Sequence, residues 1–322
     1  MIHSRLLVPA LLAIAALSAP AAETPAAPKP AAPKPAPGPK PTLANVPYGT
    51  HPKQVLDFYK AESATPTPVL FFIHGGGWTG GSKDRVSSVT PYLRAGISVV
   101  SVEYRFIPEG TADGVKPPVA APLHDAARAL QFVRSKAAEW NLDKKRIAAS
   151  GGSAGACSSL WLAFHSEMAD PKSSDPIARE STRLLTAAVT GAQTTLDPQQ
   201  MKDWTPNSRY GGHAFGFATT DPKVPNSQFA NFLAGREQVL PWIKEYSPYE
   251  LVSADDPAIY LIYGAPPALG QDQKDPTHTS NFGVKLQEHC RRKGVACELV
   301  YPGAPEVKHA SIDAYLLERL KQ

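Results

Sequence analysis

The sequence predicts an α/β protein in which helices cover both faces of a mostly parallel central sheet. From Val46 onward, short β-rich runs alternate with helical patterns, and this alternation is typical of a parallel sheet. Apolar residues make up 43% of the chain and charged residues 19%, which is the range of globular proteins. The glycine-rich motifs of the chain also follow directly after predicted strands, where ligands bind in open α/β sheets.

The elements are predicted in the following order. Strands are expected at Gln54–Tyr59, Pro68–Ile73, Ile97–Tyr104, Arg146–Ser150, Leu185–Gly191, Ala258–Tyr263 and Cys297–Tyr301. Helices are expected at Ser87–Ala95, Leu123–Trp140, Ala154–His165, Ser280–Lys293 and Ser311–Leu320. No internal repeat is found, and residues 42–322 are expected to form one folded domain.

The first 41 residues are predicted to lie outside that domain. Met1–Ala22 is typical of a signal peptide, with Arg5, the apolar run Leu6–Leu17 and small residues for cleavage. The run is shorter than the roughly 20 apolar residues of a transmembrane helix, although an uncleaved anchor stays open. Residues 23–41, rich in Pro, Ala and Lys, are expected to form an extended linker. We therefore expect a secreted or periplasmic protein without stable membrane insertion.

Charge and cysteine content exclude other classes. The net charge is +4, but Arg5 supplies one unit, and Glu23 with three lysines of the linker supplies two more. The remainder is close to neutral and contains no basic patch suited to nucleic acid. Three cysteines make no disulfide framework, although Cys290 and Cys297 could pair. No metal-ligand spacing is present, and no cofactor is expected.

A candidate nucleophile follows the predicted strand Arg146–Ser150. Gly151, Ser153 and Gly155 fit the pattern G-x-S-x-G, in which a sharp turn between strand and helix lifts the serine hydroxyl from the sheet. A bare match is usually only a turn, but the strand before it and the apolar helix after it supply the required context. No G-K-[ST] ending indicates a phosphate-binding loop.

A candidate oxyanion hole follows the predicted strand Pro68–Ile73. His74, Gly75, Gly76, Gly77 and Trp78 come directly after that strand. Acyl transfer places negative charge on a carbonyl oxygen, and backbone N–H groups aimed at that oxygen stabilise it. Glycines let the backbone approach a substrate closely because they lack a Cβ.

With this HGGGW run and the serine motif, the chain resembles the esterase branch of the α/β-hydrolases. The resemblance is to carboxylesterases and to feruloyl and acetylxylan esterase-like enzymes, from Val46 to the C-terminus. It implies the α/β-hydrolase fold, oxyanion donors at Gly76, Gly77 and Ala154, and a structural role for His74.

The rest of the catalytic triad should follow Ser153 in the order acid, then histidine. His278, His289 and His309 follow a plausible acid, and His289 lies inside a helical pattern. The resemblance places the histidine after the last strand, which selects His309. The acid should follow Ala258–Tyr263, where element placement favours Asp275 over Asp272.

The expected activity is hydrolysis of a carboxylic ester through an acyl-enzyme, on short-chain acyl or feruloyl esters of carbohydrate or small alcohols. Residues 194–249 are expected to form a lid or specificity segment, with Trp204, Tyr210 and His213 near the substrate, and Trp78 beside the oxyanion loop is expected to touch it. Few residues separate the linker from the first strand, so a helical cap is not expected and the site should admit a polysaccharide ester. Amide or formamide hydrolysis, and ligand binding without catalysis, remain alternatives. The oligomeric state is left open.

Overall fold

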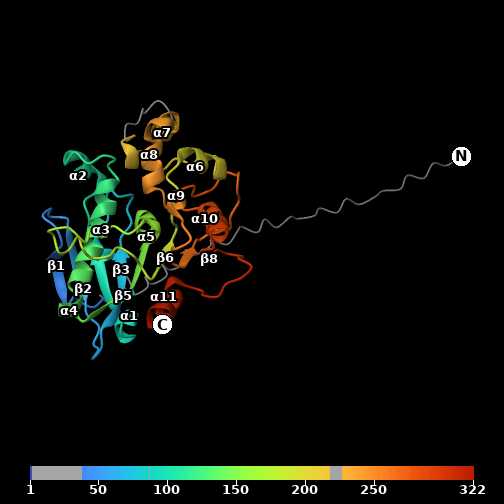
Figure 1. The fold of residues 1–322 in the computed structure, drawn as a ribbon. Helices are drawn as coiled ribbons and strands as arrows, with labels where there is room; N and C mark the ends of the chain where they lie inside the picture. The colour runs from blue at the N-terminus through green and yellow to red at the C-terminus, as the bar shows by residue number, and fades with distance from the viewer. Residues whose placement is uncertain (2–37, 87, 218–226) are drawn as a thin grey trace. The chain divides into compact units, whose positions relative to one another are not determined.

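The computed structural model describes Met1 and residues 38–86, 88–217 and 227–322, and its centre is an eight-stranded sheet (Figure 1). The strands are β1 (Leu43–Pro47), β2 (Val55–Tyr59), β3 (Thr67–Ile73), β4 (Ser98–Val102), β5 (Leu142–Gly152), β6 (Thr186–Thr190), β7 (Ile259–Ile262) and β8 (Cys297–Val300). They are arranged in the order β1-β2-β4-β3-β5-β6-β7-β8. β1, β2 and β4 pair antiparallel, and the pairs from β4 to β8 are parallel.

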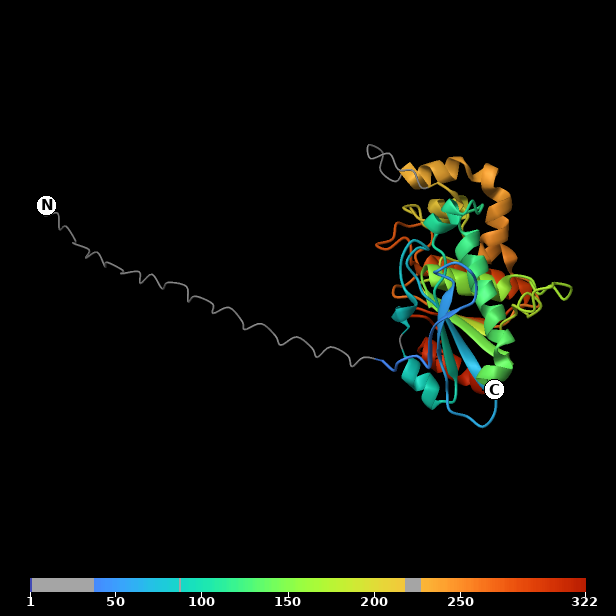
Figure 2. The same ribbon diagram turned by 90° about the vertical axis from the view of Figure 1, so that its left-hand side faces the viewer.

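Helices cover both faces of the sheet, and each face has its own hydrophobic core (Figure 2). On one face lie α3 (Ala120–Ser135), α4 (Ala137–Trp140), α5 (Ala154–Phe164) and α10 (Ser280–Lys293). The other face is covered by α1 (Val89–Arg94) and α11 (Ile312–Lys321), whose Tyr92, Tyr315, Leu316 and Leu320 form the smaller core. The inner strands β3 and β4 are buried on both sides, which explains their nearly continuous apolar sequence.

The predicted fold class is confirmed, and most predicted elements are present. α10 has the predicted bounds, while β1 and α2 (Ile107–Ala112) were not predicted. The predicted signal peptide, 1–22, and most of the linker lie outside the described residues. Within the described parts of the chain, no helix is long and apolar enough to cross a membrane. Cys157, Cys290 and Cys297 are free thiols, so the considered pairing of Cys290 with Cys297 is not formed here.

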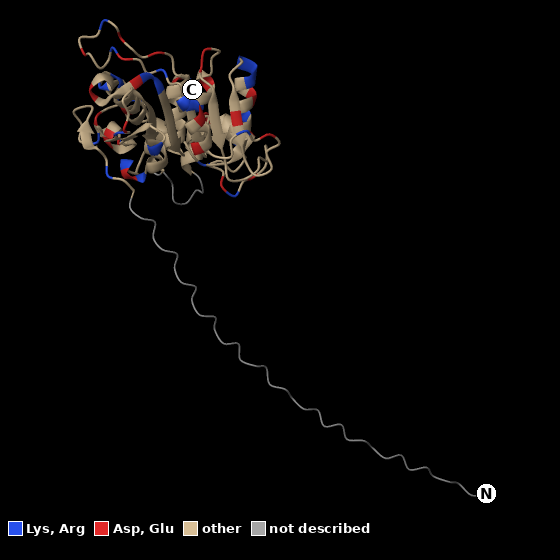
Figure 3. Cartoon of the chain, turned by 90° about the horizontal axis from the view of Figure 1, so that it is seen from below, with Lys and Arg blue, Asp and Glu red and all other residues tan. Residues whose placement is uncertain are grey.

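Residues 194–249 form a helical segment above the sheet, apart from 218–226, which are not described (Figure 1). It contains α6 (Pro198–Trp204), the 3₁₀ turn η2 (Gly212–Phe215), α7 (Ser227–Ala234), α8 (Arg236–Tyr246) and α9 (Pro248–Leu251). The segment is tied to the rest of the domain by backbone hydrogen bonds, such as the one from Val119 N to Ala214 O at 3.0 Å. Figure 3 shows acidic and basic residues interspersed on the outer helices and loops.

The sheet register brings the two glycine-rich motifs together. β3 and β5 are neighbours, and Ile73 at the end of β3 is paired with Gly151 in β5. The loop that begins at His74 and the turn that holds Ser153 therefore leave the sheet side by side. The parallel pairing of β3 with β5 thus positions the candidate site.

Candidate active site

Ser153 stands at a strained turn between β5 and α5. Its backbone has φ 55° and ψ −124°, which a residue with a Cβ rarely adopts and which costs about 1–3 kcal/mol. Two hydrogen bonds hold the turn, from Ser153 N to Thr190 O at 3.1 Å and from Cys157 N to Ser153 O at 3.0 Å. Crowding holds it as well, because a Cβ on Gly155 would collide with the carbonyl oxygen of Ile73. The surrounding structure therefore enforces the turn that presents the hydroxyl.

His278 is the histidine that contacts this serine. Its Nε2 lies 2.9 Å from Ser153 Oγ, and its Nδ1 lies 2.8 Å from Asp275 Oδ2. An ionised carboxylate only accepts hydrogen bonds, so Nδ1 carries the proton and Nε2 accepts from the serine hydroxyl. Both residues come from the loop between β7 and α10, three positions apart.

A local turn fixes Asp275. Its Oδ1 accepts hydrogen bonds from the backbone N–H groups of Thr277 and His278, at 3.1 and 3.2 Å. Partial burial opposes ionisation, but the hydrogen bond and charge of His278 and these two N–H groups lower the pKa of Asp275 below its ordinary value. Asp275 is therefore ionised when it holds the imidazole. Asp272, the alternative acid, is exposed and its side chain has no hydrogen-bond partner among the described residues.

The prediction that His309 lies against Ser153 is wrong. Its Nδ1 is 2.7 Å from Glu298 Oε2 and its Nε2 is 3.0 Å from Glu318 Oε2. The pKa of His309 is raised above its ordinary value because both partners are carboxylates. The hydrogen bond to Glu298 is the largest cause. The ring is buried and has no nitrogen left to accept a proton from a serine. His309 instead joins β8, where Glu298 lies, to α11, where Glu318 lies.

The loop after β3 exposes backbone donors beside Ser153. Gly76 and Gly77 have φ values of 119° and 63°, a region that favours glycine. The N–H groups of Gly76, Gly77 and Ala154 donate to no acceptor among the described residues, so they are free to bind an oxyanion. These are the three donors that the resemblance implied.

Trp78 was predicted to touch the substrate, but its side chain is not open to one. Its side chain is fully buried, and its Nε1 donates to Ser158 Oγ at 3.0 Å. Trp78 also has a positive φ of 56°, so its indole anchors a strained backbone. The residue supports the loop from inside.

The three aromatic residues predicted from 194–249 have different surroundings. Trp204 packs in the interior against Tyr249 and Phe282, which gives it no open face toward Ser153. His213 is half-buried, and its Nε2 lies 2.9 Å from the carbonyl oxygen of Gly77. Tyr210 packs edge-on against His213, with ring centroids 5.0 Å apart, and has a buried hydroxyl without a partner among the described residues. Tyr210 and His213 therefore flank the oxyanion loop.

An open hollow of about 650 Å³ adjoins Ser153 on the side of α1 and α11. Its lining includes the apolar side chains Leu70, Phe72, Tyr92, Ile262 and Ile312, and the loop residues Gly75 and Gly76. The triad is also accessible from solvent, since the His278 side chain is 39% exposed and that of Asp275 is 61% exposed. A serine hydroxyl in contact with a histidine, unpaired backbone N–H groups and an open, largely apolar hollow form an arrangement that suits attack on a carbonyl group.

A family model described as BD-FAE matches residues 56–279, which is more than half of the chain. The chain belongs to the BD-FAE family. The matched range contains Gly76, Gly77, Ser153, Asp275 and His278, and ends before His309. This membership confirms the predicted resemblance to α/β-hydrolase esterases.

Curated relatives match over shorter segments. The carboxylesterase NlhH of Mycobacterium tuberculosis is 40% identical over 90 residues, which cover 27% of this chain and 26% of that protein. A probable isoprenylcysteine alpha-carbonyl methylesterase of Arabidopsis thaliana, ICMEL1, is 33% identical over 114 residues, 35% of this chain and 22% of that protein. The chain therefore matches about a quarter of the length of these relatives.

Solved structures show the same fold. An acetyl ester-xyloside bifunctional hydrolase from Caldicellulosiruptor lactoaceticus has a TM-score of 0.56 and 22% identity, covering 83% of this chain and 84% of its own. A truncated carbohydrate esterase from gut microbiota has a TM-score of 0.63 and 19% identity, covering 87% of this chain and 96% of its own. At these identities the likeness establishes the α/β-hydrolase fold.

Proposed function

We propose that this protein is an exported serine hydrolase of carboxylic esters, with Ser153 as nucleophile, His278 as general base and Asp275 as the acid that orients it. The observation that carries the proposal is the continuous chain of contacts from Ser153 Oγ to His278 Nε2 at 2.9 Å and from His278 Nδ1 to Asp275 Oδ2 at 2.8 Å. A serine hydroxyl is a weak nucleophile until a neighbouring base removes its proton, and this arrangement supplies that base.

The reaction follows from these positions. His278 Nε2 takes the proton of Ser153 as Oγ attacks the ester carbonyl, and the N–H groups of Gly76, Gly77 and Ala154 stabilise the oxyanion. The protonated His278 then donates its proton to the leaving alcohol, and an acyl-serine remains. Water, deprotonated by His278, attacks this acyl group, and His278 returns the proton to Ser153 Oγ as the acid is released. Asp275 keeps Nδ1 protonated and stabilises the imidazolium in both halves of the cycle.

The site favours an ester with a bulky alcohol and a short or aromatic acyl group. His278 and Asp275 are exposed to solvent, so a polymer-borne alcohol can leave without being enclosed. The hollow beside Ser153 has an apolar lining and a volume suited to a small acyl group or a feruloyl ring. The printed names of the structural neighbours, an acetyl ester-xyloside hydrolase and a carbohydrate esterase, support acylated carbohydrate as the substrate class.

Cleavage of an N-formyl amide is the second candidate activity. A kynurenine formamidase of Danio rerio is 38% identical over 74 residues, which cover 22% of this chain and 25% of that protein. The same triad and oxyanion donors would serve either reaction, because both proceed through attack on a carbonyl carbon. The two reactions differ in their leaving group, which is an alcohol in ester hydrolysis and an amine in amide hydrolysis.

Pre-steady-state hydrolysis of p-nitrophenyl acetate tests the proposal, with Ser153→Ala as the control. We expect a burst of about one nitrophenolate per protein molecule and a loss of about 10⁴-fold or more in kcat for the variant. Acetylated xylan, methyl ferulate and N-formylkynurenine, assayed in parallel, then rank the leaving groups. Equal inactivity of the wild type and the variant on every ester would overturn the esterase proposal.

A further inference from the structure

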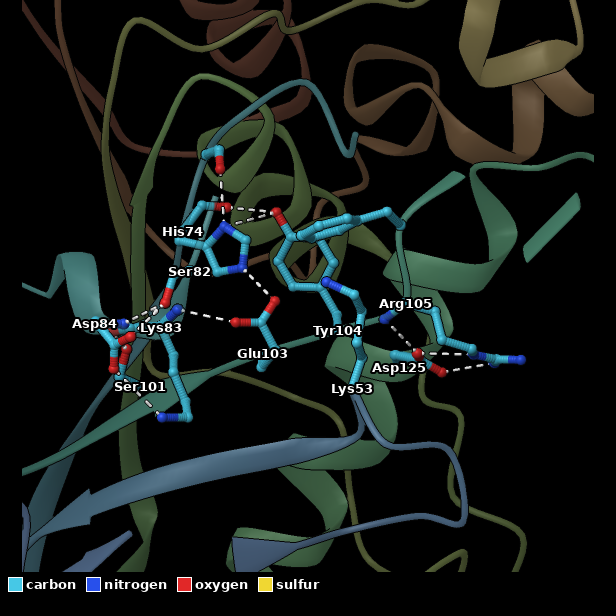
Figure 4. Close-up of polar contacts among 12 residues, drawn as sticks. Lys53, His74, Ser82, Lys83, Asp84, Ser101, Glu103, Tyr104, Arg105 and Asp125 are labelled. Carbon is cyan, nitrogen blue, oxygen red and sulfur yellow. Dashed lines mark hydrogen bonds and ion pairs between the residues drawn. The ribbon is translucent and has the colours of Figure 1, made fainter. Parts of the chain in front are cut away.

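A largely buried polar network connects the start of the oxyanion loop to neighbouring strands of the sheet (Figure 4). At its centre is His74, which directly follows β3 and is fully buried. Its ring stacks on Tyr104, with centroids 4.3 Å apart, and the loop folds back over the ring at Gly81. A Cβ on Gly81 would collide with the Nδ1 atom of His74, so the loop wraps closely around the imidazole.

Both ring nitrogens of His74 face acceptors. Nδ1 lies 2.8 Å from the carbonyl oxygen of Gly75, and Nε2 lies 3.2 Å from Glu103 Oε1. Burial favours the neutral acid, but the hydrogen bond and charge of His74 lower the pKa of Glu103 below its ordinary value. Glu103 as an ionised carboxylate only accepts hydrogen bonds, so His74 Nε2 carries a proton and donates to it, while Nδ1 also lies 3.2 Å from the Tyr104 hydroxyl.

Glu103 also reaches the far end of the same loop. Its Oε2 accepts a hydrogen bond from Lys83 N at 3.2 Å. Lys83 is itself fixed to the sheet, since Ser101 Oγ donates to Lys83 O at 2.6 Å and Lys83 Nζ lies 2.8 Å from Asp57 Oδ2. One carboxylate therefore joins the beginning of the loop, through His74, to its end at Lys83.

The segment between these two anchors contains the free N–H groups of Gly76 and Gly77. It also contains three consecutive positive φ angles, at Gly76, Gly77 and Trp78, which the chain does not adopt without support. Oxyanion donors stabilise the transition state only if they point at the developing charge before the reaction. The alignment of these donors therefore depends on what fixes the two ends of the loop.

We propose that Glu103 is a positioning residue for the oxyanion hole, which acts through the His74 ring and the backbone of Lys83 to hold the Gly76 and Gly77 N–H groups in place. This proposal rests on the proposed function, because the loop has a catalytic role only if Ser153 attacks a carbonyl. A residue that aligns the Gly76 and Gly77 N–H groups for the transition state lowers the activation barrier and leaves substrate binding nearly unchanged.

Steady-state kinetics of Glu103→Gln tests the proposal, with Glu62→Gln, an exposed glutamate, as the matched control. Losing one oxyanion donor costs about 10²–10³ in kcat, so a misaligned pair of donors should cost about 10- to 100-fold in kcat with KM changed less than about 3-fold. A double-mutant cycle with His74→Asn shows whether the effect passes through His74. We expect the double variant to be no slower than His74→Asn alone, within about 3-fold.

A loss that appears in KM, a kcat within about 2-fold of the wild type, or additive effects in the cycle would each overturn the proposal. A second readout is independent of turnover. In ¹H–¹⁵N spectra of the wild type labelled at histidine, a ring N–H signal from His74 Nε2 is expected, and Glu103→Gln should remove or shift that signal. If the wild type hydrolyses no ester, the proposed function fails, and these spectra still report whether Glu103 holds the His74 ring.

Discussion

Replacing Gly75 by alanine should separate the oxyanion loop from the serine turn. A Cβ on Gly75 would lie 2.5 Å from the carbonyl oxygen of Gly152 and 3.4 Å from Ser153 Cβ. Real Cβ atoms essentially never approach another heavy atom within 3.0 Å, so the loop or the turn must move by at least 0.5 Å. Neither can move easily, because the colliding atom is a backbone carbonyl oxygen in the turn that holds Ser153.

The size of the effect follows from this displacement. A misplacement of about 1 Å costs about 10²-fold in rate, so a shift of half that size should lower kcat about 10-fold. Overpacking should also destabilise the fold by about 1–3 kcal/mol. Without a collision, replacing glycine by alanine should instead stabilise the fold by about 0.4–1 kcal/mol, because the unfolded chain then has less conformational entropy to lose.

Initial rates of p-nitrophenyl acetate hydrolysis and thermal unfolding measure the two effects of Gly75→Ala. Gly264→Ala is the matched control, because a Cβ there meets no atom within 4 Å. The reasoning is refuted if Gly75→Ala keeps its kcat within about 2-fold and unfolds at the same or a higher temperature than the control.

Two further predictions concern the acid and the misassigned histidine. Asp275→Asn keeps the shape of the side chain but no longer fixes the tautomer of His278, so kcat should fall about 10⁴-fold. Asp272→Asn should leave kcat unchanged. Equal losses of kcat in both variants would contradict the assignment of Asp275 as the acid. His309→Gln should affect stability more than activity. Because the hydrogen bond from His309 to Glu298 raises the pKa of His309, its contribution is fully present below the unfolded histidine pKa of about 6.5 and is lost as the pH rises through the higher folded value. The difference in Tm between the wild type and His309→Gln should thus be larger at about pH 6 than at about pH 9, and a difference that does not change with pH would contradict the role of this ion pair.

The sequence was sufficient for the fold and for the position of the Ser153 turn because both depend on local patterns. Alternating strands and helices define the sheet, and G-x-S-x-G between β5 and α5 predicts a turn that the surrounding backbone enforces. The observed bounds of α10 agree with the prediction. Thr279 caps its first turn, where Thr279 Oγ1 accepts a hydrogen bond from Asn281 N at 3.3 Å, and Gly294 ends the helix with a positive φ.

The histidine could not be chosen from order along the chain alone. His278 and His309 both follow a strand at the same edge of the sheet, and only the path of each loop decides which ring reaches Ser153. Two signals were present in the sequence. His278 lies three residues after Asp275, a spacing that a local turn converts into a contact, and Glu298 and Glu318 supply partners that occupy His309.

The surroundings of the aromatic residues were also beyond sequence reasoning. The position of Trp78 beside the oxyanion loop suggested contact with substrate, but its indole lies in the interior, where Ser158 Oγ accepts its N–H. Residues 194–249 gave no clear periodic pattern, so their short helices were missed. Glu103 was not recognised because its partners, His74 and the backbone of Lys83, are far from it in sequence.

The most direct test of the account is the pair of variants His278→Ala and His309→Gln, compared by kcat/KM for p-nitrophenyl acetate at about pH 7.5, where an unperturbed histidine is mostly neutral. If His278 is the base, His278→Ala loses about 10⁴-fold or more, and His309→Gln, measured below its unfolding temperature, stays within about 10-fold of the wild type. If His309→Gln loses the activity and His278→Ala keeps it, the proposed triad is wrong and the loop after β8 supplies the base.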